Sequence, residues 1–337
     1  MSFLRLSTFS LLALLIVSCN NNIGDFTLSD FRDDLLSPVN SSISLEELSL
    51  DPARMIYHPA GFLIIAGNSE KPLLSILDLS SGKIQKIINK GRGPGELLGI
   101  WLINLAGEEL VLHGLDERKI LHLALGKDRL FFIKKELIVP EYYGRIIPFK
   151  NGYVGLPMQK EGTIMCVLDS TAKVISTIPY PDYYSRNGIP GNNSVYQCNI
   201  NCDSGKDRII VSYKSIPFID TYNSSGSLIA HRQGPELFEW SLSRKEIGGG
   251  AHIYLQQPSI RTYNRGIILP DHSWMTQYYP VGEKGTTYLL WFDPSGKPLK
   301  KYLLPEQAGL YSVDWTSRRL YLVVSEHERP SLKVYSF

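Results

Sequence analysis

The stretch Leu74-Ser-Ile-Leu-Asp-Leu-Ser-Ser-Gly-Lys-Ile-Gln-Lys-Ile-Ile88 shows how this chain is built. An apolar run ends at Asp78, a short polar turn contains Gly82, and a second apolar run follows. An aspartate can close such a turn through its side chain, and a glycine can adopt the positive φ that a chain reversal needs. The stretch therefore predicts two antiparallel strands joined by a tight turn.

The same unit recurs along the chain. Its anchor positions are residues 78, 124, 169, 223, 293 and 335, most of them about 45 residues apart. The long interval from 223 to 293 contains Gly248-Gly-Gly250 and predicts an insertion. Six units of about 40 to 50 residues, each with about four strands, are typical of a β-propeller. We therefore predict an all-β chain folded as a six-bladed β-propeller.

The last unit lacks an outer strand, because the chain ends at Phe337 where the turn would begin. Residues Ser42–Leu50 alternate between apolar and polar side chains, as a half-buried strand does. We predict that this N-terminal strand completes the last blade. Such closure joins the first blade to the last and removes open sheet edges.

Two Gly-Pro segments form a second, sparser repeat. Arg92-Gly-Pro-Gly-Glu96 is matched by Arg232-Gln-Gly-Pro-Glu236, which lacks one glycine. Gly93 and Gly234 lie 141 residues apart, or three units of 47. This spacing places them on opposite sides of a six-bladed ring. A phosphate-binding loop is disfavoured, because Pro94 lacks an N–H and no Lys-Ser/Thr pair follows. We interpret both as connectors between blades. Their charged residues are the candidates for ligand binding at a propeller face: Arg92, Glu96, Arg232 and Glu236.

The N-terminus has the pattern of a secretory signal peptide over residues 1–18. Arg5 is followed by an apolar run from Leu6 to Val17, which is too short to span a bilayer comfortably, and then by Ser18 and Cys19. We expect residues 19–41 to form a polar tether and residues 42–337 to form the propeller. An ordinary cleaved signal, or a short anchor with a chance cysteine, is the alternative.

A cysteine at this position resembles the lipobox of bacterial lipoproteins, in which the thiol is lipidated. With the segment Lys90–Leu97 and the recurring Asp-x-x-Gly-Lys turns, residues 42–337 resemble bacterial lipoproteins that have a TolB-like or NHL-like six-bladed β-propeller. The resemblance implies palmitate on Cys19, a place in the bacterial cell envelope at the outer membrane, and membrane contact through this lipid alone. The resemblance implies a fold and a cellular location more than an activity.

The composition excludes some partners. A formal net charge of +2 over 337 residues argues against a nucleic-acid partner, whose phosphates require clustered Lys and Arg. Cys198 and Cys202 can pair in an exported protein, or can be buried thiols like Cys166. Zinc is not expected, because no histidine lies near the cysteines. We predict no cofactor and no metal.

No catalytic motif stands out, so we expect a non-enzymatic scaffold that binds an envelope protein or a glycan at one face of the ring. Tyrosine doublets such as Tyr142-Tyr143 can present aromatic faces to a sugar or peptide, or can fill space between blades. The alternative is a propeller hydrolase, lyase or lactonase with a metal in the central channel, for which Asp271 and His272 are candidate ligands. Converging acidic or His side chains at the channel mouth favour the enzyme, whereas Tyr, Asn and backbone groups favour the binding protein.

Overall fold

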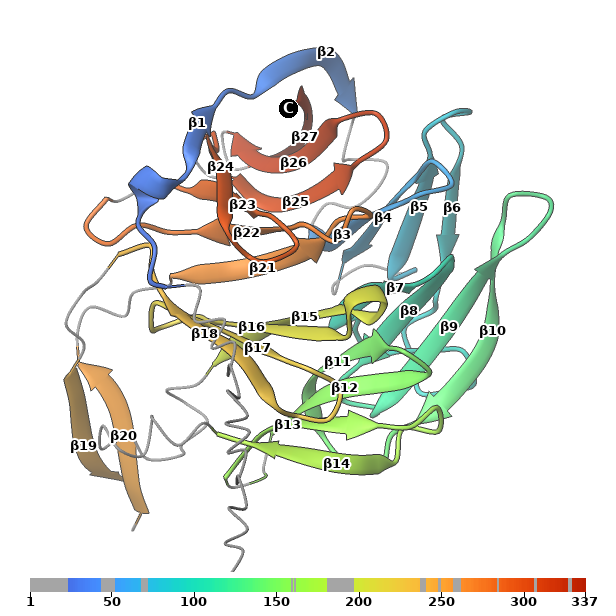
Figure 1. Ribbon diagram of the computed structural model, residues 1–337. Coiled ribbons are helices and arrows are strands. Elements are labelled where there is room, and N and C mark those ends of the chain that lie inside the picture. The colour runs from blue at the N-terminus through green and yellow to red at the C-terminus, as the bar shows by residue number, and fades with distance from the viewer. Residues whose placement is uncertain are drawn as a thin grey trace, which may run out of the picture.

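Six β-sheets are arranged as blades around a ring (Figure 1). The computed structural model describes residues 24–43, 52–67, 72–158, 160, 162–180, 197–236, 241–247, 250–256, 262–283, 285–305, 308–326 and 329–337. The only helical segments in these residues are two single 3-10 turns, η1 (Leu28–Asp30) and η2 (Ser204–Lys206). The chain is therefore all-β, and the prediction of a six-bladed propeller is confirmed.

The first three blades are four-stranded antiparallel sheets. The first comprises β3 (Pro52–His58), β4 (Phe62–Gly67), β5 (Leu74–Asp78) and β6 (Ile84–Ile87). The second comprises β7 (Leu102–Ala106), β8 (Glu109–Gly114), β9 (Lys119–Leu125) and β10 (Phe131–Ile138). The third comprises β11 (Tyr143–Phe149), β12 (Gly152–Pro157), β13 (Thr163–Leu168) and β14 (Val174–Pro179).

The other three blades include two strands from the N-terminus. The fourth blade comprises β15 (Cys198–Asp203), β16 (Arg208–Tyr213), β17 (Phe218–Tyr222) and β18 (Leu228–Gln233). The fifth comprises β21 (Tyr263–Ile268), β22 (Trp274–Tyr278), β23 (Tyr288–Phe292), β24 (Pro298–Leu303) and β1 (Arg32–Asp34). The sixth comprises β25 (Ala308–Asp314), β26 (Arg319–Glu326), β27 (Arg329–Ser336) and β2 (Ser37–Ile43).

The predicted insertion is a separate hairpin of β19 (Ser241–Ile247) and β20 (Gly250–Gln256), which pair only with each other among the described strands. It stands apart from the ring in Figure 1. The five anchors from 78 to 293 each lie on the third strand of their blade or within one residue of its end, and the sixth lies on β27. Asp78 closes its turn as expected, because its Oδ1 accepts from the N–H of Ser80 at 2.9 Å and Gly82 has φ +71°.

The first strand of each blade faces the central channel, and neighbouring inner strands contact one another around the ring. Because the strands alternate in direction, the connections fall on two faces. The turn face carries the turns after first and third strands, such as residues 79–83 and 204–207. The connector face carries the turns after second strands, such as 115–118, and the connectors to the next blade, such as 88–101.

An N-terminal strand is the outermost strand of the sixth blade. β2 pairs antiparallel with β27, with Ser37 opposite Ser336 and Ile43 opposite Leu332. The predicted strand over Ser42–Leu50 overlaps β2 only at residues 42 and 43, and residues 44–50 lie outside the described part. The strand begins earlier than the alternation of apolar and polar residues predicts. Ser37, Pro38 and Val39 already pair with β27.

The predicted tether over 19–41 is corrected by the structure from Gly24 onward. Residues 24–36, here called the N-terminal strap, pack against the fifth blade. Phe26 and Phe31 are 4% and 2% exposed, and their ring centroids lie 5.4 and 5.1 Å from that of Phe292. Strap acids that indicated a solvated tether form ion pairs instead, Asp34 with Lys300 and Asp33 with Lys301. Two buried aromatic rings therefore outweigh the polar composition.

The three cysteines that follow Cys19 are free thiols. Cys198 and Cys202 both lie on β15, where four residues of extended strand separate their Cα atoms by about 13 Å, too far for a disulfide. Burial raises the pKa of Cys198 to about 12, so its sulfur stays a neutral thiol. The interpretation as buried thiols describes Cys166 and Cys198, whereas Cys202 is only partly buried. No helix within the described ranges is long and apolar enough to cross a membrane.

Candidate functional site

The first Gly-Pro segment is a connector between the first and second blades, and Glu96 stabilises it from within. One oxygen of Glu96 accepts a hydrogen bond from the N–H of Gly93 at 2.9 Å. A Cβ at Gly91 would meet that same carboxylate at 2.1 Å, so any larger residue there would displace the Glu96 side chain from this position. These contacts agree with the connector interpretation and make Glu96 a structural residue rather than a free ligand group.

Lys119 fixes the connector to the second blade. Its buried Nζ donates to the carbonyl oxygens of Gly93 at 2.8 Å and Glu96 at 3.1 Å, and it pairs with Glu136 at 3.0 Å. The other oxygen of Glu136 accepts from the N–H of Gly95 at 2.6 Å. Hydrogen bonds from Gly95 and Lys119 lower the pKa of the Glu136 carboxyl in spite of the opposing effect of burial. A paired lysine and glutamate therefore form the floor beneath the loop.

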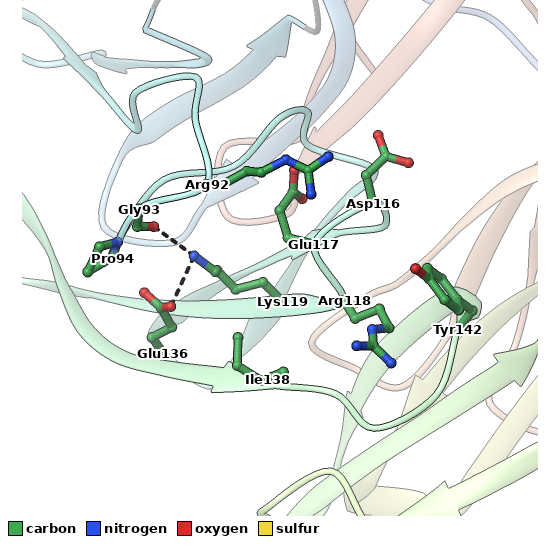
Figure 2. A pocket seen from close by; sticks show the side chains of 10 residues that line it. All are labelled: Arg92, Gly93, Pro94, Asp116, Glu117, Arg118, Lys119, Glu136, Ile138 and Tyr142. Atoms are coloured by element: carbon green, nitrogen blue, oxygen red, sulfur yellow. Dashed lines mark hydrogen bonds and ion pairs between the residues drawn. The ribbon is translucent and has the colours of Figure 1, made fainter.

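A pocket of about 410 Å³ lies beside this connector (Figure 2). It opens on the connector face, because the connector after β6, the β8–β9 turn and the end of β10 all meet there. Its lining residues carry both signs of charge and one exposed aromatic ring: Arg92, Gly93, Pro94, Asp116, Glu117, Arg118, Lys119, Glu136, Ile138 and Tyr142.

The groups in this pocket that remain available are those at its rim. Arg92 and Asp116 are exposed, and Tyr142 is 49% exposed with the Arg118 guanidinium 5.1 Å from its ring centroid. The other residue of the doublet, Tyr143, is buried at 1%. One tyrosine thus fills space between blades and the other presents its ring at the pocket.

The second Gly-Pro segment does not repeat this arrangement. Arg232 is buried at 5% and donates from Nη2 to the carbonyl oxygen of Ser295 in the next blade. Glu236 accepts from the Tyr278 hydroxyl and, at 2.9 Å, from the N–H of Val281. The strap lies directly on this segment, because a Cβ at Gly234 would meet a strap carbonyl at 2.2 Å. Arg232 and Glu236 therefore hold blades together. This corrects the prediction that they bind a ligand.

Three arginines at the channel mouth belong to no sequence motif. Arg54, Arg145 and Arg265 are each the third residue of an inner strand, in the first, third and fifth blades. A signal existed in the sequence, because Arg54 and Arg145 each precede the anchor aspartate of their own unit by 24 residues. Arg265 precedes its anchor by 28. Isolated arginines carry no motif, so only the repeat register relates them.

The residues suggested for a channel metal lie elsewhere. Asp271 and His272 occupy the β21–β22 turn on the turn face, where Asp271 accepts from the N–H of Ser273 at 3.0 Å. Nδ1 of His272 lies 3.0 Å from Asp203, which also pairs with Arg208. In the part of the chain that the structure describes, no three His, Cys, Asp or Glu residues form a group that could hold a metal ion.

Comparison with solved structures shows the fold. The chain is similar to a putative exported protein from Bacteroides fragilis. The TM-score is 0.52 and the identity is 10%, and the match covers 93% of this chain and 97% of that one. It is also similar to a member of the DUF4221 family from Bacteroides vulgatus, with a TM-score of 0.51, 10% identity and coverage of 90% and 96%.

A streptogramin B lyase has a TM-score of 0.50 and 12% identity, with coverage of 89% of this chain and 96% of the lyase. No family model and no curated protein matches the sequence. At these identities the likeness shows a shared propeller fold and nothing about activity.

Proposed function

We propose that this chain is an exported, lipid-anchored binding protein of the TolB-like or NHL-like propeller group. It acts without catalysis and binds an envelope protein or a glycan through the connector face of the ring. The observation that carries the proposal is the 410 Å³ pocket at Arg92 on this face. Its rim combines an exposed tyrosine with charged groups of both signs, and its floor is fixed by paired charges.

This pocket has the features of a recognition site. An aromatic ring with a wet hydroxyl suits the apolar face of a sugar or the side chain of a peptide. Arg92, Arg118 and Asp116 supply donors and acceptors around it, as a site for a hydroxyl-rich or polar ligand requires. The buried Lys119 and the partly exposed Glu136 hold the loop in place beneath this rim.

The anchor supports a place at the membrane surface. With lipid on Cys19, four residues lie between the anchor and Gly24, where the packed strap begins, so the two Cα atoms are at most about 18 Å apart. The propeller would then lie close to the lipid surface, with its fourth and fifth blades nearest to the anchor.

The test is a crosslinked pull-down from native membranes, together with a glycan-binding screen, using the full chain with a tag at Phe337. Wild type is compared with the double variant Arg92→Ala/Tyr142→Ala and with Arg32→Ala, which removes an exposed arginine of the strap. We expect one stoichiometric protein partner, or one class of glycan, that the double variant loses and the control keeps. No reproducible partner and no glycan with wild type would refute the proposal.

A further inference from the structure

Three arginines occupy equivalent places around the channel mouth. Arg54, Arg145 and Arg265 are each the third residue of β3, β11 and β21, and each lies at a register shift in the pairing of that strand with the next. These strands begin on the connector face and belong to alternate blades. The side chains therefore enter the mouth from three directions at one depth.

Hydrogen bonds show that two of the three side chains meet. Nη1 of Arg54 and Nη2 of Arg265 each lie 2.6 Å from the same oxygen, the carbonyl of Ala53. Arg265 belongs to the fifth blade and Ala53 to the first, so the Arg265 side chain extends past the sixth blade across the mouth. Two guanidinium groups thus share one acceptor.

Trp101 connects this pair to the third arginine. Its carbonyl oxygen accepts from Nε of Arg54 at 2.6 Å, and the Arg54 guanidinium lies 5.5 Å from its ring centroid. Its indole Nε1 donates to the carbonyl oxygen of Gly144, the residue before Arg145. The indole, 41% exposed, is therefore a fixed wall of the mouth between the first and third blades.

No carboxylate compensates these charges among the residues that the structure describes. None of the three arginines forms an ion pair there, and Arg145 has no hydrogen-bond partner among them either. Burial and then the charges of Arg54 and Arg145 lower the pKa of Arg265 to about 9, and burial and then Arg145 lower that of Arg54. Burial likewise lowers the pKa of Arg145. Partly buried like charges without a counter-charge are costly, so an arrangement that retains three of them calls for an anion.

We propose that Arg54, Arg145 and Arg265 bind a tetrahedral dianionic oxyanion, the phosphate or sulfate group of a ligand, at the channel mouth. Guanidinium forks donate pairs of N–H bonds, and three forks from three sides suit a tetrahedral group with several oxygens and more than one charge. A monocarboxylate offers two oxygens and one charge and leaves at least one arginine unmatched. The neighbouring Asn264, whose Nδ2 lies 3.2 Å from the Tyr279 hydroxyl, adds polar groups beside Arg265.

This inference rests on the proposed function in one respect, that the connector face is the binding face, and it names the chemical group recognised there. The test is titration calorimetry of the full chain at constant ionic strength in chloride. The probes are inorganic phosphate, sulfate, glucose 6-phosphate and acetate. The variants are Arg145→Met and Arg145→Lys, and the control Arg32→Ala removes an exposed arginine of the strap.

We expect phosphate or sulfate to bind, acetate to bind at least about tenfold more weakly, and Arg145→Met to weaken oxyanion binding by at least about tenfold. Arg145→Lys keeps the charge but loses the fork, and it should fall between wild type and Arg145→Met. Arg32→Ala should bind as wild type. Binding of glucose 6-phosphate as well as phosphate would identify an ester on a larger ligand, and binding of phosphate alone a free ion.

Two results would overturn the inference: no oxyanion binding to wild type at millimolar concentration, or binding that Arg145→Met and Arg32→Ala affect equally. The proposed function fails separately, when no partner or glycan is found in the pull-down and screen although phosphate binds and Arg145→Met abolishes it. Conversely, a partner that depends on Arg92 and Tyr142 but not on Arg145, with no oxyanion binding, keeps the proposed function and removes the oxyanion site.

Discussion

The two faces of the ring treat arginine differently. On the turn face, Arg208 pairs with Asp203 at 2.8 Å and Arg129 pairs with Asp78 at 2.9 Å. On the connector face, Arg54, Arg145 and Arg265 converge without an acidic partner among the described residues. All five side chains belong to the same kind of repeat, so the difference lies in what surrounds them.

The paired arginines bind one blade to the next. Arg129 lies in the second blade and Asp78 in the first, and Arg208 of the fourth blade also donates to the His272 carbonyl oxygen of the fifth at 2.7 Å. Their charge is used within the fold. At the channel mouth, Arg54 and Arg265 also donate to backbone carbonyl oxygens, but no carboxylate among the described residues neutralises the three arginines. This contrast leads us to assign their charge to a ligand rather than to stability.

The largest expected effect is on the turn face. Asp203 is 4% exposed and contacts both Arg208 and His272, so Asp203→Ala leaves a buried guanidinium without its partner. Removing one partner of a buried pair costs about 3–5 kcal/mol, and we expect a loss of that size in the free energy of unfolding, measured by urea denaturation. The control Asp169→Ala removes a partly exposed turn aspartate that pairs with no arginine among the described residues, and it should cost clearly less. Equal losses would show that the pair is not what stabilises this face.

At the channel mouth, we expect a substitution to change the free energy of unfolding in the opposite direction. Arg145→Met removes an uncompensated charge while keeping apolar bulk, so the free energy of unfolding without multivalent anions should rise by about 1 kcal/mol. Phosphate should stabilise wild type but not the variant, because a ligand that binds only the folded state adds to stability. Thermal unfolding in chloride and in phosphate measures both effects. A variant less stable than wild type in chloride would mean that Arg145 has a structural partner and that the two faces do not differ.

The sequence predicts much of this fold and less of the site, and particular residues show why. The turn with Asp78 and Gly82 is encoded locally, since side chain and backbone meet within five residues, so its recurrence is visible as a repeat. The sequence of the strap predicts a tether, because the burial of Phe26 and Phe31 depends on Phe292, which is more than 250 positions away. No local pattern reports such a partner.

The candidate site follows the same rule. The Gly-Pro connectors are local motifs and were found, but whether each stays open depends on distant contacts: the strap covers Gly234, whereas the pocket lies open beside Arg92. The channel arginines come from three blades and share no motif. Their common register within the repeats was the only sequence signal, and it gains meaning once the ring brings the third residues of the inner strands together.

The smallest effect on stability is expected for the Asp78–Arg129 pair of the turn face, and it appears as a dependence on pH. The hydrogen bond from Arg129, followed by that from Ser80, holds the pKa of Asp78 well below its usual value. A lowered folded-state pKa contributes stability that is fully present above the unfolded pKa of about 4 and is lost as the pH falls toward the folded value. Asp78→Asn should therefore lower stability modestly at pH 7 and make its decline below about pH 4 shallower, so that the two proteins converge in acid. Urea midpoints at several pH values measure this, and parallel pH profiles for the two proteins would show that the Asp78–Arg129 contact adds nothing to the pairing of this face.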